Sequence, residues 1–131
     1  MDRTAVERWV TAYERAWRTP GTDALAELFS PDISYLVSPW ADPVVGLDRV
    51  ATFWDPGPDG PDQEFTMTSE VVAVDGPVAV VRVSVGYAKA RDWRDLWVMR
   101  FDGEGRCTAF EEWPFAPGQD DGQGEYGAAG G

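Results

Sequence analysis

The sequence contains no histidine, a single cysteine and only 11 basic residues beside 23 acidic ones. Without histidine, nucleophilic catalysis of the Ser-His-Asp or Cys-His kind is excluded. Cys107 has no partner for an intrachain disulfide, and one soft ligand disfavours a zinc site. Low cysteine usage is typical of a reducing compartment, so we expect a cytoplasmic location.

The charge balance excludes further classes. A formal net charge of −12 argues against nucleic acid and against anionic membranes, because both attract basic proteins. No stretch approaches the ~18 consecutive apolar residues of a membrane span. Asp55, Asp59 and Asp62 lack the spacing of a calcium loop, and Gly103 and Gly105 sit in a hairpin turn rather than before a helix. We therefore expect no nucleic acid, membrane, metal or cofactor as partner.

Aromatic residues, by contrast, are abundant. The chain has seven Trp, six Phe and four Tyr among 131 residues, within the size of one domain. Together they exceed what a small core needs, although each one alone fits ordinary core packing equally well. This load favours an aromatic-lined cavity for a flat or apolar ligand.

The first half of the chain carries a helical pattern. Apolar residues recur at intervals of three and four between Val6 and Trp17, which predicts an amphipathic helix ended by a Pro-Gly pair. Thr4 and Glu7 have the spacing of a capping box at its start. The elements expected next are a helix over residues 23–29 stopped by Pro31, a strand over 33–37, a loop over 38–45 and a helix over 46–54.

The second half alternates with the period of a strand. Four long strands are expected over residues 65–74, 78–89, 94–101 and 106–114, separated by Gly- and Asp-containing turns. Three helices followed by an antiparallel meander predict an α+β domain over residues 1–116. Residues 117–131 are mostly Gly, Asp, Gln and Ala, which predicts a disordered tail.

This order of elements resembles the nuclear transport factor 2-like superfamily, whose members are also called SnoaL-like or cystatin-like cone folds. The resemblance covers roughly residues 4–115 and is carried by Leu28-Phe29-Ser30-Pro31-Asp32, the helix 46–54 and Trp97-Val98-Met99-Arg100-Phe101-Asp102-Gly103. It implies a cystatin-like cone in which three N-terminal helices pack on a strongly bent, mainly antiparallel sheet that encloses one pocket. The superfamily includes ketosteroid isomerases, limonene epoxide hydrolases, polyketide cyclases, dehydratases and transport factors, so it leaves the activity open.

The last strand raises the main functional question. It contains two adjacent glutamates, and alternation along a strand sends one of them to each face. Each face also carries a large aromatic residue, so hydrophobicity alone does not choose. Threading on the isomerases or the epoxide hydrolases puts Phe110 and Glu112 inward, beside Trp97 and Met99. Glu112 would then be a pocket carboxyl, with structural pairing to an arginine as the simpler alternative.

The strand 78–89 allows two orientations. An isomerase-like threading points the valine class inward, Val81, Val83, Val85 and Tyr87. A hydrolase-like threading points Arg82 and Ser84 inward, where Arg82 would pair with Glu112. The hydrolases use an Asp-Arg-Asp set, and Ser84 stands at its other Asp position, so the set is incomplete. Because the valine run resembles a core face, we favour the first orientation.

The isomerase machinery is also incomplete in this sequence. The resemblance implies a catalytic Asp before a proline after the first strand, where Ser38-Pro39 stands. The oxyanion-hole acid of those enzymes maps to Trp97, and their first-helix Tyr maps to Trp9, one turn before Tyr13. Asp42, which precedes Pro43 in the same loop, is a candidate base if the loop folds over the pocket; a turn-forming role is simpler.

These observations predict a domain that binds a small apolar or aromatic molecule in an aromatic-lined pocket. Whether it is an enzyme stays open. If it is one, cofactor-free isomerase, cyclase, dehydratase or epoxide-hydrolase chemistry would use Glu112 for proton transfer, with Tyr13 or Tyr35 donating to an oxyanion. The expected lining residues are Trp17, Tyr35, Trp40, Trp54, Phe65, Met67, Trp97, Met99 and Phe110.

The alternative is a non-catalytic scaffold or protein-interaction domain. Leu96, Val98 and Trp113 are expected on the outer sheet face, and apolar residues on such a face need covering. Folds of this superfamily often use that surface for dimers. We therefore expect a homodimer through the outer face, with or without a ligand in the pocket.

Overall fold

The computed structural model describes residues 1–55, 64–88 and 92–119. The helices in these residues are α1 (Arg3–Arg18), α2 (Leu25–Leu28) and α3 (Leu47–Trp54). The strands are β1 (Phe29–Leu36), β2 (Val44–Val45), β3 (Phe65–Asp75), β4 (Val78–Tyr87), β5 (Trp93–Phe101) and β6 (Cys107–Phe115).

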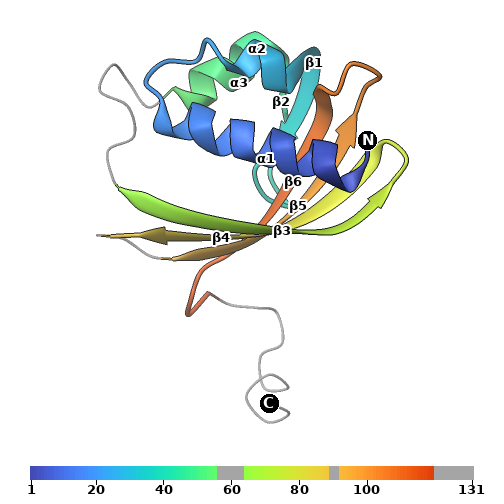
Figure 1. The fold of residues 1–131 in the computed structure, drawn as a ribbon. Helices are drawn as coiled ribbons and strands as arrows, with labels where there is room; N and C mark the ends of the chain where they lie inside the picture. The colour runs from blue at the N-terminus through green and yellow to red at the C-terminus, as the bar shows by residue number, and fades with distance from the viewer. Residues whose placement is uncertain (56–63, 89–91, 120–131) are drawn as a thin grey trace.

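One sheet organises the fold. Its strand order is β2-β1-β6-β5-β4-β3, and every neighbouring pair is antiparallel except β1 and β6, which are parallel. The sheet curves, and α1 crosses its concave side while α2 and α3 lie near β1 (Figure 1). The predicted α+β cone with a mainly antiparallel sheet is confirmed.

Helix α1 forms where the apolar spacing predicts it, but its start differs. Asp2 is the N-cap, and its Oδ1 accepts a hydrogen bond from the Ala5 N–H at 2.8 Å. The capping box predicted at Thr4 is therefore wrong, because the helix begins at Arg3, two residues earlier than a cap at Thr4 would place its start, and Thr4 lies inside its first turn. A cap at Asp2 satisfies one of the backbone N–H groups that have no partner within the helix.

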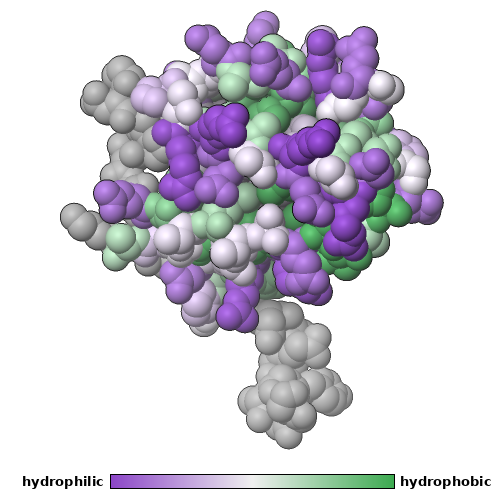
Figure 2. Space-filling view, viewed as in Figure 1, coloured by the Kyte–Doolittle hydropathy of each residue, from purple (hydrophilic) through white to green (hydrophobic). Residues whose placement is uncertain are grey.

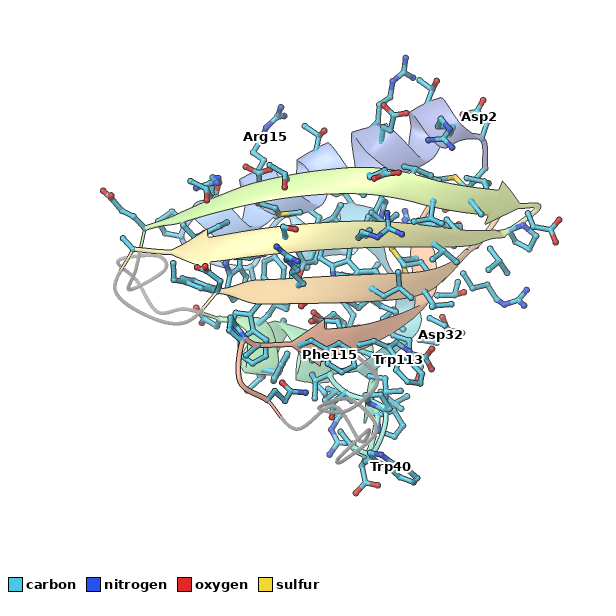
Figure 3. The ribbon with its side chains drawn as sticks, turned by 90° about the horizontal axis from the view of Figure 1, so that it is seen from below. Asp2, Arg15, Asp32, Trp40, Trp113 and Phe115 are labelled. Atoms are coloured by element: carbon cyan, nitrogen blue, oxygen red, sulfur yellow. The ribbon has the colours of Figure 1, made fainter. Side chains whose placement is uncertain are left out.

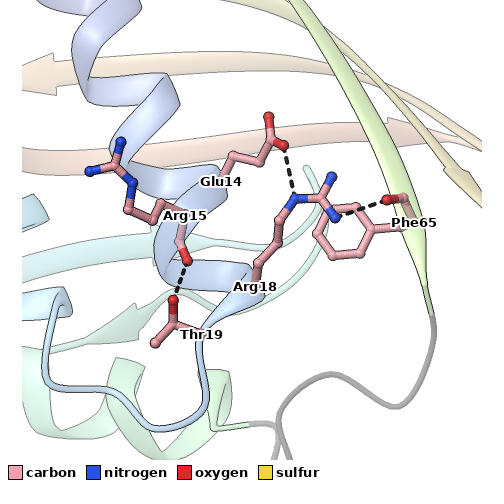
Figure 4. Close-up of polar contacts among 5 residues, drawn as sticks. All are labelled: Glu14, Arg15, Arg18, Thr19 and Phe65. Carbon is pink, nitrogen blue, oxygen red and sulfur yellow. Dashed lines mark hydrogen bonds and ion pairs between the residues drawn. The ribbon is translucent and has the colours of Figure 1, made fainter.

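Two arginines attach α1 to the edge strand β3. Arg3 donates to the Val71 carbonyl at 2.8 Å, and Arg18 donates to the Phe65 carbonyl at 2.9 Å. Arg18 also pairs with Glu14 at 2.9 Å, and its guanidinium lies 4.0 Å from the centre of the Phe65 ring (Figure 4). These contacts hold the helix along the concave side at both of its ends.

The segment after α2 differs from the prediction. The helix ends at Leu28, and β1 begins at Phe29 and includes Pro31, so the helix expected to run to Phe29 and stop at Pro31 is wrong. Phe29 pairs with Cys107 of β6, and an irregularity between Phe29 and Ser34 accommodates the proline, which has no N–H to donate. Non-local pairing with β6 therefore outweighs the local signal.

A short strand also appears inside the expected loop 38–45. Val44 and Val45 form β2, which pairs with Tyr35 and Ser34. Gly46 follows with φ of 97° and precedes α3, a backbone conformation that glycine adopts without strain.

The inner face of β4 carries the valines. Val81 and Val83 are fully buried, whereas the Arg82 side chain is 59% exposed and pairs with Glu70 at 3.3 Å. The favoured orientation of this strand is the observed one. The hydrolase-like alternative, with Arg82 inside and paired with Glu112, is wrong because the guanidinium lies on the opposite face of the sheet.

The outer face of the sheet carries exposed aromatic residues. Trp113 and Phe115 are 38% and 46% exposed on the side of the sheet opposite the helices (Figure 3). Around α1 the surface is mostly hydrophilic, with smaller hydrophobic areas between (Figure 2). In the described part of the chain, no helix has the length and apolar character needed to cross a membrane.

Three sequence predictions fall partly on residues that the structure does not describe. Of the predicted tail 117–131, residues 117–119 belong to a turn in which the Gln119 side chain accepts from the Ala116 N–H. Residues 120–131 lie outside the described residues, as do Asp59 and Asp62 of the loop after α3 and Lys89 at the predicted end of the second long strand.

Candidate functional site

A cavity of about 310 Å³ lies between the helices and the inner face of the sheet. Helices α1 and α3 and strands β1, β3, β4, β5 and β6 all contribute to its wall. Among the described residues of this wall, two carboxyl groups are the charged side chains, and most of the others are aromatic. The lining residues are Tyr13, Trp17, Tyr35, Val37, Phe53, Trp54, Phe65, Met67, Val85, Tyr87, Trp93, Asp95, Trp97, Glu112 and Pro114.

Glu112 enters the cavity because of the pleat of β6. It lies opposite Trp97 in the β5–β6 ladder, and both side chains line the cavity. Phe110, two residues earlier on the same face, is 1% exposed and lies beneath. Glu111 and Trp113 face the other way, and the Trp113 Nε1–H donates to Glu111 Oε2 at 2.9 Å.

Phe110 serves as the platform for two tyrosines. The Tyr35 ring stacks on it at 4.7 Å between centroids, and the Tyr13 ring stacks on it at 5.8 Å. Tyr13 comes from α1 and Tyr35 from β1, so the platform brings together two elements far apart in the sequence. This packing fixes where the two hydroxyl groups point.

A hydrogen-bonded chain runs from these tyrosines to Glu112. The Tyr35 hydroxyl donates to Glu112 Oε1 at 3.0 Å, and the Tyr13 and Tyr35 hydroxyl oxygens lie 3.4 Å apart. Burial raises the pKa of both tyrosines well above 10, and the nearby Glu112 charge raises the pKa of each further. Both hydroxyls therefore stay protonated and keep their capacity to donate.

Asp95 completes the acidic part of the site. It lies two residues before Trp97 on the same face of β5, close enough to the Glu112 carboxyl for each group to shift the pKa of the other. Its Oδ2 accepts a hydrogen bond from the Trp97 Nε1–H at 3.4 Å. Burial, and after it the neighbouring Asp95, raises the pKa of Glu112 to about 8, although the hydrogen bond from Tyr35 lowers it. Burial also raises the pKa of Asp95, although contacts with Glu112 and Trp97 lower it. We call Asp95 and Glu112 the carboxyl pair.

Near neutral pH the carboxyl pair is most stable with one shared proton. Two carboxylates in contact in a partly dry cavity repel each other, so the second ionisation is delayed. The pKa of Glu112, raised to about 8, indicates that the pair keeps this proton at neutral pH. The pair thus presents a carboxylic acid and a carboxylate side by side.

Two buried polar atoms at the cavity have no hydrogen-bond partner among the described residues. They are the Trp54 Nε1–H donor and the Asp95 Oδ1 acceptor. Trp54 is 3% exposed, and its indole lies near enough to the Tyr35 oxygen to lower the pKa of that hydroxyl without reaching good hydrogen-bonding geometry. The shared proton of the carboxyl pair supplies a donor for Asp95 Oδ1. Buried polar atoms in native proteins are generally paired, so the unpaired Trp54 donor points to a ligand in the cavity.

The structure places most of the predicted lining residues around this cavity. Seven of those named from the sequence form its wall together with Glu112: Tyr13, Trp17, Tyr35, Trp54, Phe65, Met67 and Trp97. Met99 and Phe110 are buried below it, where they support the wall rather than line it. Their assignment as lining residues is therefore corrected to core packing.

Two predicted site residues lie elsewhere. Trp40 is 98% exposed, and Figure 3 shows it at the far end of the loop after β1, away from the cavity. Asp42 is exposed in the same loop. Because β1 turns back through β2, this loop projects outward instead of folding over the pocket, so the expected places of Trp40 and Asp42 are wrong.

The sequence-based prediction missed the second carboxyl. Asp95 shares the inward parity of Trp97 and Met99 in β5, and that shared parity is the signal that identifies it. Tyr87 and Val85 were placed inward by the same reasoning and do line the cavity, beside Phe53, Trp93 and Pro114. Among residues 1–55, 64–88 and 92–119, no group of three or more acidic, cysteine or histidine side chains is arranged to hold a metal ion.

Comparison with known proteins places this geometry in context. The SnoaL-like domain family model matches residues 6–110 of the chain. No curated protein sequence is detectably similar.

Solved structures with the same fold have little sequence in common with the chain. A nuclear transport factor 2-like protein of unknown function from Burkholderia xenovorans is 14% identical with a TM-score of 0.69, covering 96% of this chain and 93% of that one. A steroid delta-isomerase from Pseudomonas aeruginosa is 18% identical with a TM-score of 0.63, covering 88% and 82%. An LEH-like epoxide hydrolase from M. tuberculosis is 16% identical with a TM-score of 0.59, covering 86% and 84%.

Proposed function

Because the chain belongs to the SnoaL-like domain family, we propose that its cavity binds a small, mainly apolar molecule and that the carboxyl pair exchanges a proton with it without a cofactor. One observation carries this proposal. Asp95 and Glu112 line the same aromatic-walled cavity and shift each other's pKa, with the pKa of Glu112 raised to about 8. Carboxyl groups tuned in this way are characteristic of acid–base sites.

The pair supplies both partners of a proton transfer. The Asp95 carboxylate accepts a proton from a carbon next to a ligand carbonyl, and the electron pair of the broken C–H bond moves to the carbonyl oxygen. Glu112 then gives its proton to that oxygen or to a second carbon. The Tyr35 hydroxyl, 3.0 Å from Glu112 Oε1, stabilises the glutamate that this step leaves ionised.

The structural neighbours support a proton-transfer site without fixing the reaction. They include a steroid delta-isomerase and an epoxide hydrolase, and both of these reactions move protons. The chain departs from the isomerase residue set at Ser38 and Trp97, and from the hydrolase set at Ser84 and the outward-facing Arg82. The proposal therefore rests on Asp95 and Glu112 of this chain.

Deuterium exchange tests the proposal directly. A panel of small cyclic ketones is incubated with the protein in deuterated buffer, and loss of the α-proton signal is followed by NMR. We expect exchange above the buffer rate, and a fall of about 100-fold or more in Glu112→Gln. Glu111→Gln is the matched control, because Glu111 is the adjacent residue on the opposite face and should keep the native rate.

Two results would contradict the proposal. One is native-like exchange in Glu112→Gln together with Asp95→Asn, which would move the chemistry away from the carboxyl pair. The other is an ordinary pKa for Glu112 in a carboxyl-carbon NMR titration of the folded protein.

A second function, self-association, is favoured by one observation on the outer face. Leu96 lies opposite Trp113, and Arg94 lies opposite Phe115, so three apolar side chains at least 37% exposed are neighbours there. Clusters of this kind mark interaction sites when they are contiguous. Analytical ultracentrifugation of the native protein and of Trp113→Arg tests it: a native dimer that the variant dissociates supports the homodimer, and a native monomer rejects it.

A further inference from the structure

The carboxyl pair holds negative charge that no described side chain of the cavity wall compensates. None of the described wall residues is Lys or Arg. The ion pairs that described residues form with one another lie elsewhere, and they are Arg18–Glu14, Arg82–Glu70 and Arg106–Glu104. Tyr35 and the Trp97 indole donate hydrogen bonds to the pair, but no positive charge faces it from the described wall residues. A buried charge that lacks a counter-charge is costly, so the cavity favours a ligand that brings a positive charge with it.

The wall around the pair is built from electron-rich rings. Five helices and strands contribute four tryptophans and three tyrosines to this wall. The ring centroids of Tyr13 and Trp97 lie 4.7 Å apart. Trp17 and Trp54 meet edge to face at 4.8 Å. The faces of such rings attract ammonium groups, most strongly when water is excluded. The rings concerned are those of Tyr13, Trp17, Tyr35, Trp54, Tyr87, Trp93 and Trp97.

The unpaired indole of Trp54 is an independent sign that the ligand is polar at one point. Its Nε1–H is buried, lines the cavity and has no hydrogen-bond acceptor among the described residues. A purely apolar ligand would leave this donor unsatisfied. A ligand that carries an oxygen acceptor as well as a charge satisfies both ends of the site.

From these observations we infer that the ligand of this cavity is a small organic ammonium ion, held by the aromatic rings and the carboxyl pair, with an oxygen that accepts from Trp54. This inference rests on the proposed function, because it names the class of molecule that the same site takes. It differs from that function in requiring a positive charge on the ligand.

Binding of an ammonium ion is coupled to the proton of the pair. The titratable groups that face Glu112 are Tyr13 of α1, Tyr35 of β1, Tyr87 of β4 and Asp95 of β5, and the three tyrosines stay neutral through this range. A cation beside the pair favours its doubly ionised form, so the shared proton leaves on binding. Affinity for a cation that cannot itself titrate therefore rises as pH increases through about 8.

The test compares two probes of the same shape. Phenyltrimethylammonium carries a permanent charge, and tert-butylbenzene is its neutral isostere. Binding of each to the full chain is measured by quenching of tryptophan fluorescence between pH 6 and pH 9. We expect the cation to bind about tenfold more tightly at pH 7, and its affinity to rise with pH while that of the isostere stays constant.

Variants assign the preference to the pair. Glu112→Gln leaves one carboxylate, so it should keep the preference for the cation but lose the rise with pH. The double variant Asp95→Asn with Glu112→Gln should lose the preference and still bind the isostere, which shows that it is folded. Glu111→Gln, on the outer face, should behave like the native protein.

The outcomes separate this inference from the proposed function. If the isostere binds as tightly as the cation, the inference is overturned, while the ligand site remains supported and the ketone exchange experiment decides the proton transfer. If the double variant keeps the preference, the carboxyl pair does not recognise the charge and the inference also fails. If neither probe binds, the inference is again overturned, and the ketone exchange experiment alone decides the proposed function.

Discussion

The two faces of strand β6 carry the same side chain in two environments. Glu111 shares the outer face with Trp113, which is 38% exposed and donates to it at 2.9 Å. Glu112, the next residue, faces the cavity, where burial raises its pKa to about 8 and Tyr35 donates to its Oε1. Neighbouring glutamates in one strand thus differ in chemistry because of the pleat alone.

The comparison shows that strand register sets the chemistry of this site. A shift of one residue in β6 would exchange the faces of Glu111 and Glu112. Parallel pairing with β1 holds the register on one side, where Tyr35 lies opposite Phe110. Antiparallel pairing with β5 holds it on the other, where Trp97 lies opposite Glu112. The orientation of Glu112 toward the cavity therefore depends on the packing of the inner face, which holds this register.

Truncating one aromatic residue on each face gives the largest expected contrast. Phe110→Ala removes a ring that is 1% exposed and that stacks with Tyr13 and Tyr35, so we expect the free energy of unfolding to fall by about 3–5 kcal/mol. Trp113→Ala removes a ring from the outer face and should lower it by about 1 kcal/mol in the monomer. Urea unfolding followed by circular dichroism measures both.

Equal losses for the two variants would break the comparison between the faces. If Trp113→Ala costs as much as Phe110→Ala only at high protein concentration, the outer face is covered by a second copy. The concentration series is therefore part of the measurement, because dimerisation makes apparent stability depend on concentration.

The second contrast lies in the pH dependence of stability. The pKa of Glu112 in the folded protein, about 8, exceeds its ordinary value of 4.5, so the folded state binds more protons between those pH values. Stability of the native protein therefore falls as pH rises from about 4.5 to about 8. Glu112→Gln should remove most of this fall. Relative to the native protein, the variant should gain about 4 kcal/mol in the free energy of unfolding between pH 4.5 and pH 9.

Glu111→Gln is the control for this profile. It removes a carboxyl from the same strand without changing the cavity, so the native fall with pH should remain. A fall that survives in Glu112→Gln and disappears in Glu111→Gln would reverse the assignment of the two faces.

The sequence predicts the architecture well because its strongest signals are long. The helical spacing from Val6 to Trp17 and the strand alternation after Phe65 extend over many residues, and the structure has elements at both places. The valine class of β4 identifies the buried face for the same reason. Where non-local pairing competes with a single local signal, as at Pro31, the prediction fails.

The site is less predictable because it depends on distances between strands. Parity places Asp95 inward, but only the pairing of β5 with β6 brings it to Glu112. Trp40 and Asp42 are wrongly assigned because a loop with two prolines and one tryptophan carries no signal for the direction it takes. Their exposure follows from the pairing of β1 with β2, which no local sequence pattern predicts.

The smallest expected effect belongs to the outer face of β4. Arg82 and Glu70 pair at 3.3 Å with side chains 59% and 68% exposed, and such pairs are worth only a few tenths of a kcal/mol. Arg82→Gln should therefore change the free energy of unfolding by less than about 0.5 kcal/mol, and the difference should shrink further in high salt. It should also leave the pKa of Glu112 and probe binding in the cavity unchanged, because the guanidinium lies on the other side of the sheet from the carboxyl pair. A change in either property would mean that Arg82 interacts with Glu112, as in the arrangement implied by the epoxide hydrolases. The buried valines of β4 would then not separate the outer face of the sheet from the cavity.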